Sequence, residues 1–181
     1  AMHLIGDFNN WNRTSHPMKA VGNGNWEIEI PGVRTLKHRG KVKVAVTSPR
    51  GTEDRIPLYA TYVVQDEKTH NFSAAIWNPR KEFVWTDEKF RPKKNVPPLI
   101  YEAHVGMATE EERVGTYLEF MRDILPRIKK DGYNTVQLMA IMEHPYYASF
   151  GYQVSNFFAA SSWYGTPDDL KALINEAHAL G

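Results

Sequence analysis

The chain has 181 residues, and its 22 Lys plus Arg against 21 Asp plus Glu give a net charge of +1, which points to no nucleic-acid partner. It contains no Cys, which excludes disulfide bonds and thiolate metal sites. No apolar run approaches the roughly 20 residues of a membrane span, and the opening AMHLIGDF lacks the parts of a signal peptide. We therefore expect a soluble, cytoplasmic protein with no membrane partner.

Short β-strands are predicted in the first part of the chain. The predicted strands cover residues 3–5, 26–30, 41–46, 58–65 and 71–77. Residues 26–30 (WEIEI) and 41–46 (KVKVAV) alternate strictly, so Trp26, Ile28 and Ile30 should face one side. Short antiparallel strands separated by turns are typical of an all-β sandwich.

A Pro-rich segment then separates two parts of different pattern. Residues 91–98 (RPKKNVPP) hold three Pro and three cations, which predicts a stiff, solvated connector. We therefore divide the chain into a β domain at residues 1–90, the connector at 91–98 and a second domain at 99–181.

The second domain has a strand–helix–strand pattern. Strands buried on both faces are predicted at residues 99–105 (LIYEAHV) and 135–141 (TVQLMAI). Between them, residues 116–130 carry a helical apolar stripe, and Pro126 should kink or shorten that helix. This order is typical of a parallel α/β sheet.

A second helix is predicted after an aromatic loop. Thr166 fits the N-cap, Pro167 the first helical position and Asp169 the third position of a capping box, while Gly181 fits the position after the helix. The loop before this helix follows a buried strand, and such loops build the active sites of α/β barrels.

Aromatic side chains are abundant in polar surroundings. The chain has 5 Trp, 9 Tyr and 8 Phe, many of them beside Asn, Gly, Ser or Pro. Aromatic rings in such places suit sugars, because the C–H face of a sugar stacks on a ring while its hydroxyl groups bond to amides. We expect most of these rings to be buried or half-buried, and a minority to be candidates for sugar contact.

Several motifs occur in order along both domains. They are residues 6–12 (GDFNNWN), 54–57 (DRIP), 63–66 (VVQD), 77–79 (WNP), 101–106 (YEAHVG), 133–144 (YNTVQLMAIMEH), 150–154 (FGYQV) and 164–167 (YGTP). On these motifs the chain resembles the glycogen (1,4-α-glucan) branching enzymes of glycoside hydrolase family 13, of the eukaryotic type, over essentially its whole length.

The resemblance implies a fold and an activity. The fold is an immunoglobulin-like β-sandwich of the carbohydrate-binding CBM48 type, followed by the first β/α units of a TIM (β/α)8 barrel that is incomplete here. The activity is that of a retaining glycosyltransferase, which cleaves an α-1,4 linkage and transfers the oligoglucan to a 6-hydroxyl to form an α-1,6 branch. The implied partner is an α-glucan such as glycogen, starch or a maltooligosaccharide, and no cofactor is implied.

The resemblance also places the catalytic carboxylates after Gly181, so no catalytic residue is expected within the chain. We expect the chain to be a part of a longer enzyme that is inactive alone. Glu102 is interpreted as a polar group in the barrel wall. Glu143 and His144 lack the second His of a zinc-binding HExxH motif, so no metal site is predicted.

Three candidates for glucan binding lie in or beside the aromatic loop. By resemblance, Tyr152 is the aromatic platform under the sugar at the cleavage subsite, and Gln153 and His144 line the same cleft. The alternatives are a half-buried loop position for Tyr152 and structural roles for Gln153 and His144.

Three further candidates lie in the β domain. Trp11 follows two Asn in a turn-like loop and would stack on a glucose ring, with a core position as the alternative. Asn10 could bond a sugar hydroxyl or simply supply a left-handed turn conformation. Trp26 begins a strand, so we expect it to face inward, with sugar contact as its alternative.

Two other functions stay open. The chain could be a glucan-binding module without enzymatic purpose, but a bare module would not carry barrel strands after the connector. It could instead be part of a debranching, isoamylase-type enzyme of family 13, although residues 140–144 (AIMEH) and 157–167 (FFAASSWYGTP) favour branching.

Overall fold

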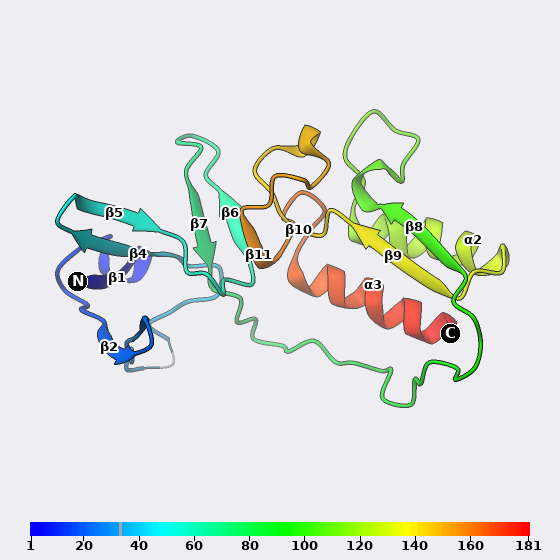
Figure 1. Cartoon of the computed structure of the whole chain (residues 1–181), viewed down its shortest axis with the longest axis horizontal. Helices are drawn as coiled ribbons and strands as arrows, with labels where there is room; N and C mark the ends of the chain where they lie inside the picture. The colour runs from blue at the N-terminus through cyan, green and yellow to red at the C-terminus, as the bar shows by residue number, and fades with distance from the viewer. Residues whose placement is uncertain (33) are drawn as a thin grey trace. The chain divides into compact units, whose positions relative to one another are not determined.

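The computed structural model describes residues 1–32 and 34–181, which form two compact units. Unit 1 covers Ala1–Arg80 and unit 2 covers Lys81–Gly181 (Figure 1). The division therefore lies before the connector that the Pro-rich segment predicts at residues 91–98. The assignment of the two parts to a carbohydrate-binding module and a barrel stays a prediction.

Unit 1 is built from antiparallel strands. The strands are β1 (Met2–Gly6), β2 (Lys19–Gly22), β3 (Asn25–Glu27), β4 (Lys41–Ser48), β5 (Gly51–Arg55), β6 (Val63–Gln65) and β7 (Phe72–Ala75). The main sheet has the order β1-β4-β7-β6, and β5 also pairs with β4. A separate hairpin is formed by β2 and β3. The buried apolar residues of this unit are Ile5, Val42, Ala45, Val63, Ala74 and Ala75.

The strand predictions for unit 1 need two kinds of correction. The strand expected at residues 26–30 ends at Glu27, and the one expected at 58–65 begins only at Val63. Strands β2 and β5 were not predicted, because KAVG and GTEDR lack an apolar alternation. They are strands because their backbones pair with β3 and β4. The immunoglobulin-like sandwich as a whole stays a prediction.

Unit 2 contains a pair of parallel strands with helices packed against them. Its strands are β8 (Ile100–His104), β9 (Thr135–Met139), β10 (Met142–Glu143) and β11 (Asn156–Ala160), and its helices are α1 (Tyr117–Glu119), α2 (Leu125–Lys130) and α3 (Pro167–Leu180). Strands β8 and β9 are parallel, with Ala103 opposite Leu138. Strands β10 and β11 form an antiparallel pair.

Burial of β8 differs from the prediction of a strand buried on both faces. Leu99 and Ile100 are 55% and 49% exposed, and burial begins only at Ala103. The physical reason is that, within the described part of the chain, β8 pairs with β9 alone. The carboxyl end of β8 is nevertheless buried, and this is the end from which the candidate site is built.

The helix between β8 and β9 is continuous but not regular. A π-helical segment at Phe120–Ile124 joins α1 to α2, and Pro126 lies in the first turn of α2. Because the helical turns run on without a break, Pro126 lies inside the helix, where its ring would clash with the preceding turn and its missing N–H removes one intrahelical bond. The irregularity predicted at Pro126 is therefore a widened turn just before it.

Helix α3 begins as its sequence predicts. The Thr166 hydroxyl accepts a hydrogen bond from the Asp169 backbone N–H (3.2 Å), and the Thr166 N–H donates to the Asp169 carboxylate (2.8 Å). These reciprocal bonds form the predicted capping box. Gly181 follows the last turn with φ 77°, a left-handed conformation that glycine adopts easily.

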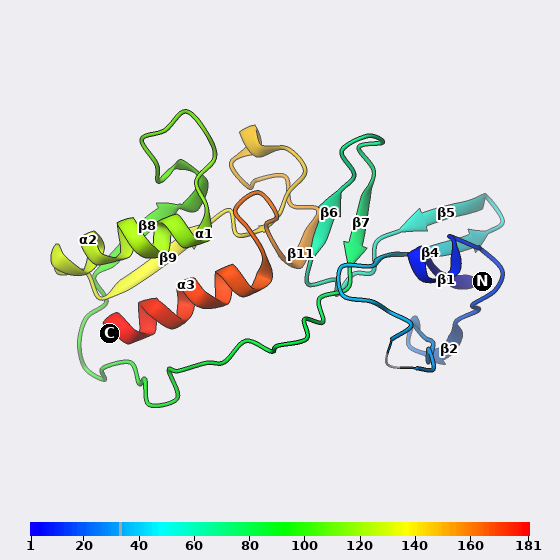
Figure 2. The same ribbon diagram turned by 180° about the vertical axis from the view of Figure 1, so that it is seen from behind.

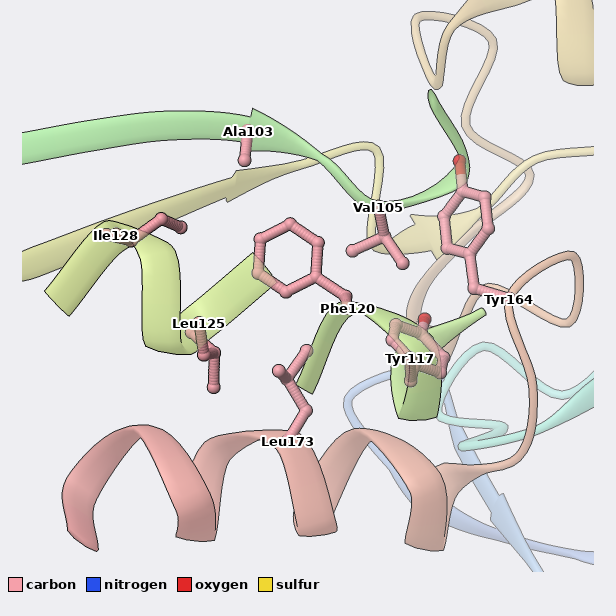
Figure 3. Close-up of a cluster of buried hydrophobic side chains, with 8 residues drawn as sticks. All are labelled: Ala103, Val105, Tyr117, Phe120, Leu125, Ile128, Tyr164 and Leu173. Carbon is pink, nitrogen blue, oxygen red and sulfur yellow. The ribbon is translucent and has the colours of Figure 1, made fainter. Parts of the chain in front are cut away.

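One apolar core holds the parallel strands and the helices of unit 2 together. Its buried members are Ala103, Val105, Tyr117, Phe120, Leu125, Ile128, Tyr164 and Leu173. Figure 3 shows Phe120 in the middle of this cluster, between the strand that carries Ala103 and Leu173 of α3. Burial of such side chains contributes about 1.5–3 kcal/mol each. The core therefore fixes the carboxyl ends of β8 and β9 relative to the start of α3.

Among the described residues, no helix has both the length and the apolar character that crossing a bilayer requires.

Candidate functional site

The candidate site lies where the parallel strands β8 and β9 end. His104 closes β8 and Met139 closes β9. We call residues 144–155, between β10 and β11, the aromatic loop. Figure 2 shows that this loop and the segment after β8 lie at the same end of the parallel pair. The carboxyl ends of parallel strands are where α/β folds place their binding sites.

Two glycines let the aromatic side chains pack closely at this end. A Cβ atom on Gly106 would lie 2.6 Å from the Tyr164 ring and 2.9 Å from the Tyr147 ring. A Cβ atom on Gly151 would lie 2.5 Å from the Cβ atom of Ala140, just after β9. Since real side-chain atoms do not approach so closely, glycine is required at both positions. The aromatic loop is thus fitted against the ends of both parallel strands.

Tyr152 is presented on the outer side of this loop. Its backbone N–H donates to the carbonyl of Ser149 (3.0 Å), while its side chain is 84% exposed. Gln153 is exposed beside it. Tyr146 and Phe150 are other exposed rings of the same loop. The loop therefore offers aromatic faces with an adjacent amide, a combination that suits a sugar ring.

Beneath these exposed residues lies a buried cluster of two imidazoles and a phenol. The Tyr164 hydroxyl lies 3.4 Å from Nε2 of His104, and the ring centroids of His144 and Tyr164 are 6.0 Å apart. The Nδ1–H of His144 donates to the carbonyl of Met142 (2.9 Å). This bond leaves Nε2 of His144 facing the interior. Nε2 of His144 and Nδ1 of His104 are buried without a hydrogen-bond partner among the described residues.

Burial favours the uncharged forms of His104 and Tyr164. Burial lowers the pKa of His104, and the neighbouring His144 lowers it further. Burial likewise raises the pKa of the Tyr164 hydroxyl. Desolvation disfavours the charged form of each group, which explains both directions. Uncharged His104 and Tyr164 side chains beside the aromatic loop suit an uncharged ligand better than an ionic one.

Glu143 is the buried carboxyl group of this region, with 1% of its surface exposed. One of its oxygens accepts a hydrogen bond from the Ser162 backbone N–H (2.7 Å), and the other lies 3.2 Å from the Ser162 hydroxyl. Burial raises the pKa of Glu143 to about 7, against the opposite effect of the bonds from Ser162. Glu143 therefore faces the protein interior rather than the exposed rings.

Two of the three candidates in unit 1, Asn10 and Trp11, belong to a hydrogen-bonded turn after β1. The indole N–H of Trp11 donates to one carboxylate oxygen of Asp7 (3.1 Å), and the other oxygen accepts the Lys41 backbone N–H (2.8 Å). Asn10 is exposed and has the left-handed φ of 52°. These contacts give Trp11 a structural task and give Asn10 the turn conformation that was its alternative role.

Trp26 lies in the hairpin of unit 1. It is opposite Ala20 in the β2–β3 pair and is half-buried. This position agrees with a packed side chain, and sugar contact by Trp26 stays a prediction.

The six predicted glucan contacts thus fall into two groups. Tyr152 and Gln153 are adjacent and exposed, and His144 is fully buried at the start of the same loop. Asn10, Trp11 and Trp26 lie in the other unit. The positions of His104 and Tyr164 beneath the loop were missed. His104 ends a predicted parallel strand, and that place in the sequence is the signal that could have drawn attention to it.

Two cavities are lined by residues other than the predicted glucan contacts. One of about 440 Å³ is lined mainly by apolar side chains of α2, β9 and α3. The other, of about 530 Å³, is lined in unit 1 by several cations, among them Arg34, Lys37 and Arg39. Among the described residues, Tyr152, Gln153 and His144 line neither of them.

Comparison with known sequences places these features in a family context. Residues 1–60 match the family model described as "Carbohydrate-binding module 48 (Isoamylase N-terminal domain)". The "1,4-alpha-glucan-branching enzyme" of Rhizophagus irregularis is 50% identical over 100% of this chain, and the match covers 27% of that protein. The enzyme of the same name from Dictyostelium discoideum is 45% identical over 99% of this chain. The chain thus spans about a quarter of the length of the curated relatives it matches.

The chain is also similar to a plant enzyme and to solved structures. The "1,4-alpha-glucan-branching enzyme 2-2, chloroplastic/amyloplastic" of Arabidopsis thaliana is 47% identical over 100% of this chain and is covered over 23% of its own length. A putative alpha amylase from Salmonella typhimurium matches 99% of this chain with a TM-score of 0.78 and 22% identity, over 28% of its length. A pullulanase from Bacillus acidopullulyticus matches 99% with a TM-score of 0.74 and 21% identity, over 25% of its length. The two structures show a shared fold. The chain is therefore similar to 1,4-alpha-glucan-branching enzymes along its whole length, and its residues 1–60 match the module 48 model.

Proposed function

We propose that the chain is part of a 1,4-α-glucan branching enzyme and contributes a glucan-binding surface to it. The observation that carries this proposal is the 50% identity to a named branching enzyme over the full length of the chain. The proposed reaction of the whole enzyme is cleavage of an α-1,4 linkage and transfer of the oligoglucan to a 6-hydroxyl. Such a retaining transfer uses a carboxylate nucleophile and a carboxylic acid, and we assign neither role to a residue of this chain.

The proposal includes an architecture for each unit. Unit 1 is proposed to be a carbohydrate-binding module of the 48 type, supported by the family match at residues 1–60. In unit 2, β8, the following helical segment, β9 and α3 are proposed to be the first β/α units of a (β/α)8 barrel. Support comes from the parallel pairing of β8 with β9 and from the fold shared with a putative alpha amylase.

The aromatic loop is the proposed place of glucan contact within unit 2. Tyr152 is proposed to stack on a glucose ring, because its exposed ring is an apolar face next to a side-chain amide. Gln153 is proposed to bond a sugar hydroxyl. His144 is buried, so its proposed part is to support the loop, with direct sugar contact as the alternative. The proposed partner is an uncharged α-glucan, without a cofactor, and a cytoplasmic location stays a prediction.

A debranching function is the competing proposal. The description of the module family mentions isoamylase, and pullulanases are among the structural neighbours. These pullulanases are only 18–21% identical, whereas branching enzymes from fungi, Dictyostelium and plants are 45–50% identical. Sequence identity at that level favours branching over debranching.

Calorimetric titration of the chain with maltoheptaose tests the proposed contact. We expect Tyr152→Ala to weaken binding by at least about tenfold, which corresponds to ~1.4 kcal/mol. Tyr152→Phe keeps the ring face and should stay within about threefold of the wild-type affinity, because stacking needs no hydroxyl. Tyr133→Ala removes an exposed tyrosine ring just before β9, at the end away from the aromatic loop, and serves as the matched control. Equal affinities for the wild type and Tyr152→Ala would contradict the assignment of Tyr152.

A further inference from the structure

Glu143 is a buried carboxyl group that the proposed function leaves without a task. Its side chain is almost completely enclosed, at 1% exposure. Among the described residues, no Lys, Arg or His forms an ion pair with it. Burying a carboxyl group without a cation is costly unless hydrogen bonds compensate. Its partners therefore indicate what it does.

The hydrogen-bond partners of Glu143 lie just before and just after β11, the strand that follows the aromatic loop. Its backbone carbonyl accepts hydrogen bonds from the backbone N–H (2.9 Å) and the hydroxyl (3.2 Å) of Ser155. Its side chain bonds to Ser162, just beyond β11, through the backbone N–H (2.7 Å) and the hydroxyl (3.2 Å). One residue thus fastens the end of the aromatic loop and the segment that follows β11.

The next residue adds a third attachment. The indole N–H of Trp163 donates to the carbonyl of His144 (2.9 Å), and the Trp163 ring packs against Tyr147. Tyr152 and Gln153 lie between the attached positions, on the part of the loop that is exposed. Loss of these attachments would free the residues that the proposed function places against glucan.

We propose that Glu143 is a positioning residue that fastens the aromatic loop and so holds Tyr152 and Gln153 in place for a glucan chain. The fastening itself is independent of any ligand. Only its consequence for glucan affinity rests on the proposed function.

The protonation state of Glu143 should change the strength of this fastening. The neutral acid can donate to the Ser162 hydroxyl while its other oxygen accepts the Ser162 N–H. The carboxylate accepts both bonds but carries a buried charge. The titratable groups that interact with it are the hydroxyls of Tyr117 and Tyr164, and the backbone of the adjacent His144 also bonds to it. No cation among them is fixed to balance the charge.

The direction of the pH effect follows from the raised pKa. The pKa of Glu143 is about 7 in the folded chain against an ordinary value of 4.5. Between these values the folded state binds more protons than the unfolded state, so stability falls as pH rises from about 4.5 to about 7. The fastened loop should therefore be tighter in mildly acidic than in mildly alkaline solution.

Hydrogen–deuterium exchange of the whole chain, with no glucan present, tests the inference. After correction for intrinsic exchange, we expect protection of residues 144–162 to fall at least about tenfold between about pH 5 and about pH 8. Glu143→Gln keeps both bonds with Ser162 and cannot ionise, so its protection should not change with pH. Glu102→Gln is the matched control, because Glu102 is an exposed carboxylate bonded to Gln137 (2.8 Å), and it should behave as the wild type.

The outcomes separate the inference from the proposed function. An equal pH dependence in the wild type and in Glu143→Gln, or no pH dependence in the wild type, would overturn the positioning role. Glu143→Ala should lose protection at both pH values; if it does not fold, the Glu143→Gln comparison still decides. In maltoheptaose titrations, the affinity of the wild type should fall with the same pH profile and that of Glu143→Gln should not. A pH-dependent loop in a chain that binds no glucan would support the fastening and refute the proposed function instead.

Discussion

Trp11 combines an unusual backbone conformation with a specific hydrogen bond. Its φ of 59° lies in the left-handed region, next to Asn10 at 52°. Its indole N–H is bonded to Asp7, which also bonds the backbone of Lys41 at the start of β4. Asp7 therefore links the turn after β1 to the central strand of the sheet, and Trp11 completes that link.

This arrangement predicts a loss of stability when the indole donor is removed. Trp11→Phe keeps an aromatic ring but loses one hydrogen bond, and we expect unit 1 to lose about 1 kcal/mol of unfolding free energy. Urea unfolding followed by circular dichroism measures the change. A large loss of maltoheptaose affinity with unchanged stability would instead support the role of Trp11 as a sugar platform.

The residue-level predictions succeeded where a side chain meets only local backbone. The capping box of Thr166 and Asp169 depends on a spacing of three residues, which the sequence states directly. The environment of His144 depends on segments distant in the sequence, since its neighbour Tyr164 comes from the turn before α3. Sequence patterns contain no direct information on such contacts, and the burial of His144 was therefore not predicted.

At the scale of elements, the aromatic loop depends on the close fit of Gly151 against Ala140. Gly151 has φ 82°, and its position after β9 leaves no room for a side chain. Gly132 offers a natural comparison, since it has φ 91° but nothing within 4 Å of the position of a Cβ atom. Both glycines have a left-handed backbone conformation, but only Gly151 is packed closely against another residue.

Alanine at each glycine should separate these two effects. Gly132→Ala should cost about 1–2 kcal/mol of unfolding free energy, for the left-handed conformation alone. Gly151→Ala should cost about 1–3 kcal/mol more, because the added methyl group overlaps Ala140. Thermal unfolding of both variants gives the difference. Equal losses would show that the loop does not pack tightly on the end of β9.

The strand predictions likewise failed where a strand depends on contacts with segments distant in the sequence. Strand β4 was predicted because KVKVAV alternates, and it is the strand to which β1, β5 and β7 all pair. Strand β5 was missed because GTEDR has no apolar face and pairs through its backbone. The parallel pair β8 and β9 was predicted as two buried strands, yet only the carboxyl end of β8 is buried. Burial depends on neighbouring elements, which a local pattern does not specify.

At the scale of the whole molecule, the chain combines two units with different proposed tasks. Unit 1 contains the module 48 match, and unit 2 contains the aromatic loop at the ends of two parallel strands. A simple binding module would need only unit 1 to contact glucan. A branching-enzyme segment should also contact glucan through Tyr152 and Gln153 of unit 2. The two proposals therefore differ in where a bound oligosaccharide protects the chain.

The most direct test of the account is a hydrogen–deuterium exchange footprint of maltoheptaose on the chain, at a ligand concentration that saturates binding. The account predicts increased protection in peptides that cover residues 144–155, and Tyr152→Ala should abolish it while leaving any protection in residues 1–60 unchanged. Protection confined to residues 1–60, or no protection anywhere, would contradict the claim that the aromatic loop binds α-glucan.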